Sequence, residues 1–444
     1  MWNAIAFFAE NMWNRWNIFA SNDIIMIMKQ FIPGETYVPV SGKVFDQEEI
    51  NNAIEVAKEG WWTEGAWAKL FEQEFKKFLG VRYVSLVNSG SSANLVALAS
   101  LTSLVFGDRR LKSGDEFITC SVAFPTTVNP GLQYGLKPVF IDAELDTLNI
   151  DASQIEKAIT EKTKLIMMAH TLGKPYNLKI IMKLAKKYNL WVIEDSCDAL
   201  GSKYDGKLVS SFGDIATFSF YPAHQMTMGE GGAVVTNNSL IHKSIRQFRD
   251  WGRDCWCDTG KDNTCRKRFG WKLGELPHGY DHKYIYSQIG YNLKSTDFQA
   301  AIGCAQLKKL PGFVKKRQEN YKILYKFFNQ YKKYFILMKE DKNEEVSYFG
   351  FPAIVKPTAP FSRNELTEYL EKNRIGTRNV FSGNLLRHPA YLNRKKSFKI
   401  IGDHKNADFI MNNAFWLGVY PGITREMMGY VKDVVEKFMT EIQE

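Results

Sequence analysis

The chain has 444 residues, of which 45% are hydrophobic and 24% charged, and a formal net charge of +10. This length is enough for two domains with large cores, and the composition excludes a disordered or fibrous chain. The positive charge favours anionic ligands, but lysine and arginine are scattered and no nucleic-acid-binding motif is present, so we expect no nucleic-acid partner.

Residues 1–45 are predicted to be an N-terminal arm. Apolar residues recur there at helical spacing on one face: Trp2, Ile5, Ala6, Ala9, Met12, Trp13 and Trp16. Polar residues interrupt the run, which therefore lacks the apolar core of a signal peptide, and the chain has no stretch of about 18 apolar residues to span a membrane. We expect a helical arm packed on the body or on a second subunit, in a cytoplasmic protein.

Residues 46–300 are predicted to form a large α/β domain. Asp46 to Glu49 has the pattern of a capping box for a helix that Gly60 ends, and a second helix is expected from Ala66 to Gly80. Apolar β-type runs then alternate with helical patterns; the runs are Tyr83 to Val87, Glu116 to Cys120, Pro138 to Ile141, Leu165 to Ala169 and Leu190 to Ile193. This alternation predicts a mainly parallel sheet covered on both faces, with ligands at the carboxyl ends of the strands.

Residues 301–444 are predicted to form a smaller α+β domain, with the boundary inside a long helical stretch. The expected elements are helices at Asp297 to Leu310 and Phe313 to Tyr331, a strand at Tyr348 to Val355, and helices at Arg363 to Asn373 and Thr424 to Ile442.

The stretch from Ala216 to Thr236 predicts a strand, a turn at Tyr221-Pro222, a polar tip carrying His224, a Gly-Glu-Gly-Gly reversal and a second strand. A histidine lifted out of a sheet edge in this way can transfer protons. The stretch resembles the cofactor loop of the pyridoxal-phosphate-dependent sugar aminotransferases of the DegT/DnrJ/EryC1 family, in which Ser-Phe-x-x-x-Lys precedes a Gly-rich turn. In this chain His224 stands at the lysine position.

The exchange of lysine for His224 has a chemical consequence. Imidazole cannot form a Schiff base with the cofactor aldehyde, so we expect the amine form, pyridoxamine 5′-phosphate, with His224 as the base. An ordinary aminotransferase would need the lysine, whereas the 3-dehydratases of 4-keto-6-deoxy sugars need only a base that deprotonates the cofactor carbon. The resemblance, which covers roughly residues 40–440, also implies fold type I of the pyridoxal-phosphate-dependent transferases, with a mainly parallel seven-stranded sheet.

Several residues match the family's phosphate-binding positions. Asn88 to Asn94 is a Ser/Gly-rich turn between a strand and a helix, which by itself predicts no more than an N-cap. The resemblance implies that Gly90 and Ser91 of this turn, together with Ser219, hold the cofactor phosphate. It also implies that Asn292 reaches the phosphate of a neighbouring subunit, in a homodimer with shared sites.

Three further positions match residues that hold the cofactor ring. Asp195 follows a predicted strand, and the resemblance implies that it pairs with the pyridine nitrogen. Asp198 takes the position that bonds the ring's 3-hydroxyl group, and Phe124 the position that stacks on the ring. An ordinary core phenylalanine fits the sequence around Phe124 nearly as well.

Three of the six cysteines, Cys255, Cys257 and Cys265, lie within eleven residues in a loop rich in turn formers, which predicts a metal site. With Cys197 as the fourth ligand the order is Cys-x57-Cys-x-Cys-x7-Cys. Zinc accepts four thiolates equally well. The place of Cys197 beside the cofactor residues favours a [2Fe–2S] cluster that passes electrons. The two remaining cysteines, Cys120 and Cys304, are expected to be buried apolar residues.

Histidine in place of lysine, combined with this cysteine order, resembles the family members that dehydrate CDP-4-keto-6-deoxyglucose for O-antigen sugars. This implies an NADH-dependent flavin and iron–sulfur reductase as electron donor. Two alternatives stay open: a cluster-free GDP-sugar 3-dehydratase and a non-catalytic paralogue that binds a nucleotide sugar. Arg378, Asn384 and Arg387 are candidate substrate contacts, and Arg266 to Arg268 a candidate docking site for the reductase, although such basic runs are more often solvated.

Overall fold

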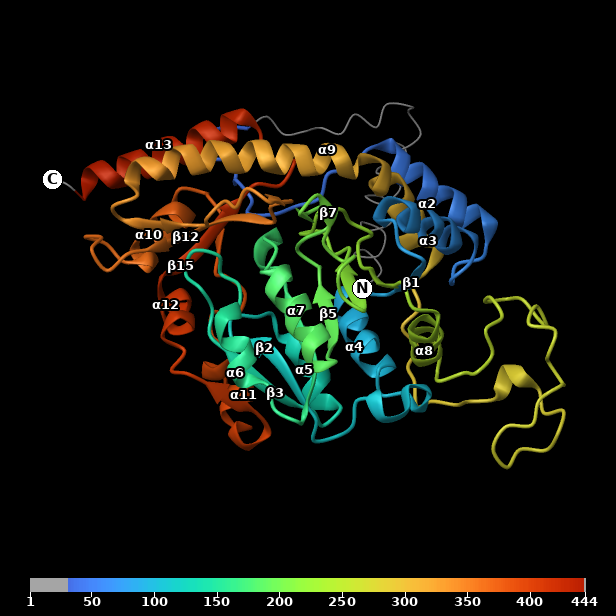
Figure 1. Cartoon of the computed structure of the whole chain (residues 1–444). Coiled ribbons are helices and arrows are strands. Elements are labelled where there is room, and N and C mark those ends of the chain that lie inside the picture. Colours follow the sequence, from blue (N-terminus) through green and yellow to red (C-terminus); the bar gives the residue numbers. More distant parts are fainter. Residues whose placement is uncertain (1–30, 443–444) are drawn as a thin grey trace, which may run out of the picture. The chain divides into compact units, whose positions relative to one another are not determined.

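A computed structural model of the chain describes residues 31–442. Most of the predicted N-terminal arm, residues 1–30, lies outside the described residues, so the helix expected there stays a prediction. The described residues from Tyr37 onward form one unit by packing. Its regular structure begins with helices α2 (Gln47–Glu59) and α3 (Ala66–Leu79), which both pack against the long helix α9 (Asp297–Phe328) (Figure 1).

The first helix begins and ends as predicted. Asp46 accepts a hydrogen bond from the backbone N–H of Glu48, and the Glu49 carboxylate accepts one from the N–H of Asp46, which completes the capping box. Gly60 follows the last turn with a φ of 73°, a left-handed conformation that glycine adopts without steric cost. The predicted limits of α2 are confirmed.

A mainly parallel sheet forms the centre of the unit. Within the described residues its order is β1-β9-β8-β5-β4-β2-β3-β14; only the β8–β9 and β1–β9 pairs are antiparallel. The strands are β1 (Tyr83–Val87), β2 (Glu116–Cys120), β3 (Lys137–Ile141), β4 (Thr163–Ala169), β5 (Trp191–Asp195), β8 (Ile215–Ser219), β9 (Gly232–Thr236) and β14 (Lys399–Ile401). The predicted fold class is confirmed. The eighth strand, β14, was not predicted because three residues are too few to show a period.

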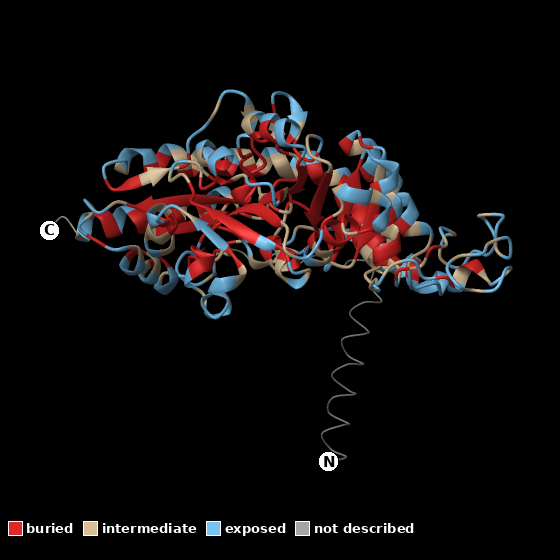
Figure 2. Ribbon diagram, turned by 60° about the horizontal axis from the view of Figure 1, so that its bottom comes forward, coloured by how far each residue is buried: buried red, intermediate tan, exposed pale blue. Residues whose placement is uncertain are grey.

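Helices cover both faces of this sheet (Figure 1). They are α4 (Gly90–Ser100), α5 (Pro125–Gln133), α6 (Ile155–Ala158), α7 (Leu178–Tyr188) and α8 (Ser239–Arg249). Neighbouring strand residues point to opposite sides: Ile118 and Ile166 belong to one apolar cluster, Phe117 and Leu165 to another. Figure 2 shows the strands almost entirely buried. The polar residues therefore lie mainly at the ends of the strands. Parallel α/β sheets bind their ligands at the carboxyl ends of the strands.

The C-terminal part contains a second, antiparallel sheet of order β10-β12-β15-β13 among the described residues. Its elements are β10 (Phe335–Leu337), β12 (Gly350–Val355), β13 (Thr377–Arg378), β15 (Ala414–Gly418), α10 (Arg363–Lys372), α11 (Pro389–Leu392), α12 (Lys405–Asn413) and α13 (Arg425–Glu441). A three-stranded sheet joins β11 (Glu344–Glu345), β6 (Lys203–Tyr204) and β7 (Lys207–Leu208). The division near residue 300 stays a prediction.

The two helices expected around Pro311 are one continuous helix, α9, so the predicted break there was wrong. Proline removes a single backbone donor. Buried residues on both sides, Leu310 before it and Arg317 and Tyr321 after it, hold the same helix face against the protein. Tertiary packing therefore keeps the helix continuous at Pro311.

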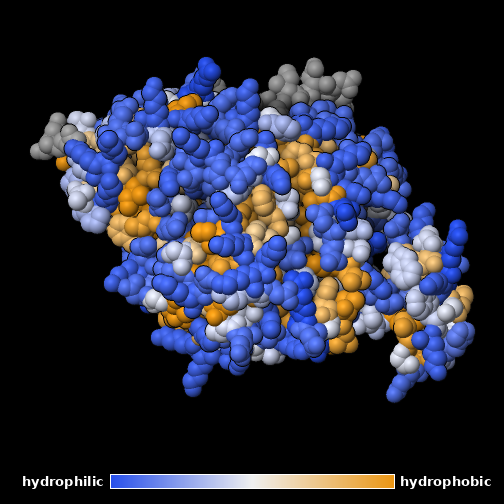
Figure 3. Space-filling model, in the orientation of Figure 1, coloured by the Kyte–Doolittle hydropathy of each residue, from blue (hydrophilic) through white to orange (hydrophobic). Residues whose placement is uncertain are grey.

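The surface seen in Figure 3 is mostly hydrophilic, with hydrophobic atoms gathered in separate patches. Among the described residues no helix combines the length and apolarity that crossing a membrane requires.

Candidate active site

A cavity of about 440 Å³ lies at the carboxyl ends of the central strands. Its lining includes most of the predicted site: Gly90, Ser91, Phe124, Asp195, Cys197, Asp198, Ser219 and His224. These residues come from four separate stretches of sequence that the parallel sheet brings to one edge. A larger cavity, of about 650 Å³, lies beside α3 and α8, but charged groups of its lining, such as Arg249 and Glu64, pair with each other.

The predicted phosphate position is the first turn of α4. Ser89 caps this helix by accepting from the N–H of Ser92, and Gly90 and Ser91 follow at the end of β1. A side chain at residue 90 would collide with Ser219, because an added Cβ would lie 2.4 Å from the Ser219 Cβ. The free N–H groups of a helix start and a neighbouring hydroxyl form a cradle suited to an anion. The residues present therefore fit a phosphate.

Asp195, the last residue of β5, is buried and firmly oriented. Its Oδ2 accepts hydrogen bonds from Asn94 Nδ2 at 2.8 Å and from Thr127 Oγ1 at 2.7 Å. Thr217 in turn donates to Asn94 Oδ1 at 2.6 Å. A carboxylate held by two donors stays in one position, which suits a partner for a pyridine N–H. Sequence reasoning missed Asn94 and Thr127 because only the fold brings them to Asp195.

His224 and Asp198 face each other in the cavity. Nδ1 of His224 lies 3.4 Å from Oδ1 of Asp198, without completing a hydrogen bond, and Oδ2 of Asp198 is buried with no partner among the described residues. Burial raises the pKa of Asp198, and the neighbouring His224 opposes that rise. A buried polar atom without a protein partner can hydrogen-bond to a water molecule or to a polar group of a ligand. The pair is therefore placed to meet a polar group in the cavity.

The loop that carries His224 is held by groups that sequence reasoning did not single out. Arg317 of α9 is buried, and its guanidinium donates to the carbonyls of His224, Tyr348 and Phe349 at 2.7, 3.2 and 3.2 Å. Gln225 donates to the carbonyl of Asp198. The local sequence does not distinguish a buried arginine on a helix, such as Arg317, from a solvent-exposed one.

Aromatic residues form part of the cavity wall. Phe124 is 51% exposed although it lines the cavity, so it is not a core residue, and its ring meets Phe381 edge-on with centroids 6.5 Å apart. Phe349, which precedes β12, and Trp416 of β15 also line the cavity and contact each other, and the ring of Phe349 is 5.2 Å from that of His224. This apolar lining suits a flat ring.

Among the candidate substrate contacts, Arg378 lines the cavity. Asn384 and Arg387 do not: both bind Asp408 of α12, at 2.8 Å each, and Asn384 caps the turn at residues 385–387. Their role as substrate contacts stays a prediction; in the structure both side chains pair with the carboxylate of Asp408.

Asn292 lies outside the lining of this cavity and is exposed, and its Oδ1 accepts from Lys294 at 2.7 Å. Its predicted contact with a neighbouring subunit stays a prediction.

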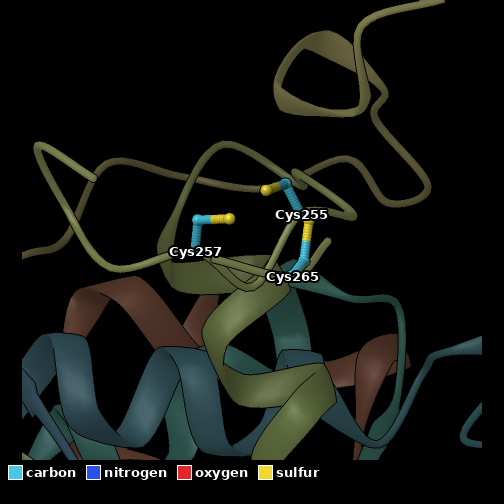
Figure 4. Close-up of side chains that lie close together, drawn as sticks. All are labelled: Cys255, Cys257 and Cys265. Carbon is cyan, nitrogen blue, oxygen red and sulfur yellow. The ribbon is translucent and has the colours of Figure 1, made fainter. Parts of the chain in front are cut away.

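The three clustered cysteines meet in the long loop after α8. Within the described residues their sulfurs form a group in which all atoms lie within 4.8 Å of one another, and Figure 4 shows the side chains converging. Burial raises the pKa of Cys255 to about 11. Burial also raises that of Cys257, but hydrogen bonds from Thr264 and from the N–H of Cys265 outweigh it and lower the value to about 7. Three convergent sulfurs suit a soft metal.

Cys197 is not a member of that sulfur group. It lines the cofactor cavity instead, where burial and the carboxylates of Asp195 and Asp198 raise its pKa well above the ordinary value. Cys120 and Cys304 are buried, as expected, and burial raises the pKa of each to about 12.

The sheet and the cavity at its carboxyl edge are those of a fold type I, pyridoxal-phosphate-dependent enzyme. The chain belongs to the DegT/DnrJ/EryC1/StrS aminotransferase family, whose model matches residues 43–438.

Two sequence relatives are close in length. The chain is 51% identical over 410 residues to the lipopolysaccharide biosynthesis protein RfbH of Salmonella typhimurium, covering 92% of this chain and 93% of that protein. It is 46% identical over 411 residues to the dTDP-4-dehydro-2,6-dideoxy-D-glucose 3-dehydratase of Saccharopolyspora spinosa, covering 93% and 88%.

Among solved structures, E. coli GDP-4-keto-6-deoxy-D-mannose-3-dehydratase with bound hydrated PLP is similar, with a TM-score of 0.79 and 28% identity over 90% of this chain and 99% of that one. The chain is thus an enzyme of the sugar 3-dehydratase and aminotransferase family of deoxysugar biosynthesis, with a pyridoxal-phosphate-type cofactor.

Proposed function

We propose that the protein removes the C3 hydroxyl group of CDP-4-keto-6-deoxyglucose, with pyridoxamine phosphate as cofactor and His224 as base, in 3,6-dideoxyhexose synthesis for O-antigen. The observation that carries the proposal is a histidine, not a lysine, in the cavity beside Asp195 and Asp198. The Salmonella relative's name, which refers to lipopolysaccharide biosynthesis, agrees with a cell-surface sugar as product.

The cofactor's phosphate is assigned to Gly90, Ser91 and Ser219, and its ring to Asp195 and Phe124. When bound, pyridoxamine phosphate supplies an amine for the C4 ketone and a conjugated system that accepts electrons. Asp195, whose Oδ2 accepts from two donors, would pair with the pyridine nitrogen and favour its protonated form.

His224 is proposed to remove a proton from the cofactor's C4′ carbon, and the same imidazole is proposed to protonate the departing C3 hydroxyl group. Asp198, whose Oδ2 has no partner in the described part of the chain, is assigned to the 3-hydroxyl group of the ring. Arg317 and Gln225 position this pair through the carbonyls of His224 and Asp198.

A [2Fe–2S] cluster is proposed at Cys255, Cys257 and Cys265, with Cys197 as the fourth ligand that the sequence order predicts. The three convergent sulfurs fit such a group. The cluster would supply electrons one at a time from an NADH-dependent flavin and iron–sulfur reductase.

The reductase's docking surface is not assigned, because Arg268 pairs with Asp281 within its own loop. A homodimer, in which Asn292 serves the neighbouring site, belongs to the same proposal. So does a cytoplasmic location, since six free cysteines suit a reducing compartment.

The nucleotide is the finer part of the proposal, because relatives are named for dTDP and GDP sugars. The test offers the CDP, dTDP and GDP forms of the 4-keto-6-deoxy sugar to anaerobic protein loaded with pyridoxamine phosphate. We expect a change in cofactor absorbance and loss of the C3 oxygen with the CDP form. No reaction with any of them would overturn the proposal.

The same assay separates the alternatives. A cluster-free dehydratase of the GDP type would contain no iron or sulfide and would regain its amine from glutamate. A non-catalytic paralogue would bind the nucleotide sugar without changing it.

A further inference from the structure

A buried lysine outside the cofactor cavity, Lys174, pairs with two carboxylates of one segment. Its Nζ lies 3.1 Å from Oδ2 of Asp341 and 2.5 Å from Oε2 of Glu344, and its side chain is only 1% exposed. The two acidic residues belong to residues 340–349, which connect β10 to β12 and which we call the strap. Lys174 itself lies between β4 and α7. It therefore ties the strap to the loops of the large sheet.

The strap forms part of the wall of the cofactor cavity. Its Phe349 lines that cavity, and the ring centroid of Phe349 lies 5.2 Å from that of His224. The strap passes close to the segment after β4. The N–H of Phe349 donates to the Leu172 carbonyl at 3.0 Å, and a Cβ added to Gly173 would lie 2.2 Å from the carbonyl oxygen of Ser347. A glycine at this position therefore allows the close approach.

The strap also supports the loop that carries the proposed base. Gln225, which follows His224, donates to the Ser347 carbonyl at 3.1 Å. Arg317 donates to two carbonyls of the strap and, at 2.7 Å, to the carbonyl of His224. A shift of the strap would therefore change the hydrogen bonds of both side chains that hold the His224 loop.

The main chain at Lys174 is fixed independently of the strap. Nδ2 of the buried Asn149 donates to the Lys174 carbonyl at 3.1 Å, and Oδ1 of Asn149 accepts from the N–H of Thr171 at 3.0 Å. The lysine is therefore a fixed point to which the strap can be attached.

The charges make this attachment specific. Removing one partner of a buried ion pair leaves an uncompensated charge, which is strongly unfavourable. Burial acts to raise the pKa of Asp341, but hydrogen bonding with Lys174 and its positive charge lead the opposing effects, which lower the value. Burial also raises the pKa of Glu344, and Lys174 opposes that rise. Both carboxylates of the strap are thus stabilised in their charged form by the same ammonium group.

We propose that Lys174 is a positioning residue of the active site: it holds the strap through Asp341 and Glu344 and thereby sets the positions of Phe349 and of the His224 loop. Lys174 does not line the cofactor cavity, so it acts on the reaction through the strap. The inference rests on the proposed function for the reaction whose rate is measured, but not for the position of the strap.

The test compares full-length protein loaded with pyridoxamine phosphate as wild type, Lys174→Met, Lys174→Arg and, as matched control, Lys203→Met. Lys203 pairs with Glu345 of the same strap, but these two side chains are 39% and 61% exposed, and exposed pairs contribute little. Hydrogen–deuterium exchange followed by mass spectrometry measures the backbone N–H groups of residues 340–349. Entry of labelled solvent oxygen into the C3 hydroxyl group of CDP-4-keto-6-deoxyglucose measures the reaction.

In Lys174→Met we expect faster hydrogen exchange in the strap and a kcat of oxygen exchange that is roughly 10- to 100-fold lower, since a displacement of about 1 Å can cost that much. KM and the binding of pyridoxamine phosphate should change much less, because the groups assigned to the cofactor's phosphate and ring belong to other segments. Lys174→Arg keeps the positive charge and should recover part of the rate. Lys203→Met should match the wild type in both measurements.

A wild-type kcat in Lys174→Met, or unchanged hydrogen exchange in its strap, would overturn the positioning role. So would an equal loss of rate in Lys203→Met. If Lys174→Met does not fold, Asp341→Asn, which weakens one of the two ion pairs, must show faster strap exchange and a lower kcat, and wild-type values there would overturn the role.

Failure of the proposed function gives a different result. Wild-type protein that exchanges no oxygen with the CDP sugar contradicts the proposed function. Hydrogen exchange then decides the attachment by itself: faster exchange in the strap of Lys174→Met upholds it, and unchanged exchange overturns it.

Discussion

Replacing Arg317 by methionine tests how the His224 loop is positioned. The guanidinium makes three hydrogen bonds to buried carbonyls, of His224, Tyr348 and Phe349. A hydrogen bond to a charged group contributes about 1.5–3 kcal/mol. Burial of the charged guanidinium reduces the stability that these hydrogen bonds contribute. Burial lowers the pKa of Arg317 to about 10, and the nearby carboxylate of Asp198 partly offsets this effect. We therefore expect a net loss of about 3 kcal/mol in the free energy of unfolding.

Urea unfolding at neutral pH measures this loss. Lys315→Met is the matched control, because that side chain is exposed on the same helix and its replacement should change stability by less than about 0.5 kcal/mol. Arg317→Lys should recover little, since one ammonium group cannot reach three separate carbonyls. Turnover of Arg317→Met should also fall because the His224 carbonyl is released. If Arg317→Met and Lys315→Met were equally stable, the positioning role of Arg317 would be refuted.

Two further predictions concern the cofactor cradle and acid stability. Gly90→Ala brings a Cβ to 2.4 Å from the Ser219 Cβ, so binding of pyridoxamine phosphate, followed by absorbance titration, should weaken by about 10-fold or more, whereas Gly312→Ala, which meets no atom within 4 Å, should bind normally. Burial, with the cationic Arg246 beside it, lowers the pKa of His242 from 6.5 to about 4. Between these values the unfolded state binds more protons, so wild-type stability should fall by up to about 3 kcal/mol as the pH drops from 6.5 to 4. His242→Gln should remove that part of the pH dependence; identical pH profiles would contradict it.

Local signals predicted much of the fold. The capping box at Asp46, Gly60 and the apolar runs of the central strands depend on neighbouring residues only, and the structure has them where expected. The break at Pro311 and the missed strand Lys399–Ile401 are tertiary effects, since distant side chains and a distant strand decide them.

The site was predictable where it follows a strand end. Asp195 and Ser219 terminate parallel strands, so the sheet itself brings them together. The groups that orient the site, such as Asn94 and Arg317, act across long sequence separations and carry no local pattern. The number of residues between Cys197 and the other cysteines does not determine how far apart their two loops lie in space.

The central claim is that His224 is the base of a dehydratase that works without a lysine. His224→Asn removes the base and leaves the residues assigned to the phosphate and pyridine ring in place. Isotopically labelled solvent oxygen entering the C3 hydroxyl group of CDP-4-keto-6-deoxyglucose measures reversible dehydration directly. We expect the exchange rate to fall 10²- to 10⁴-fold, about 3–5 kcal/mol of barrier, while pyridoxamine phosphate stays bound. Exchange at the wild-type rate in His224→Asn would contradict the account.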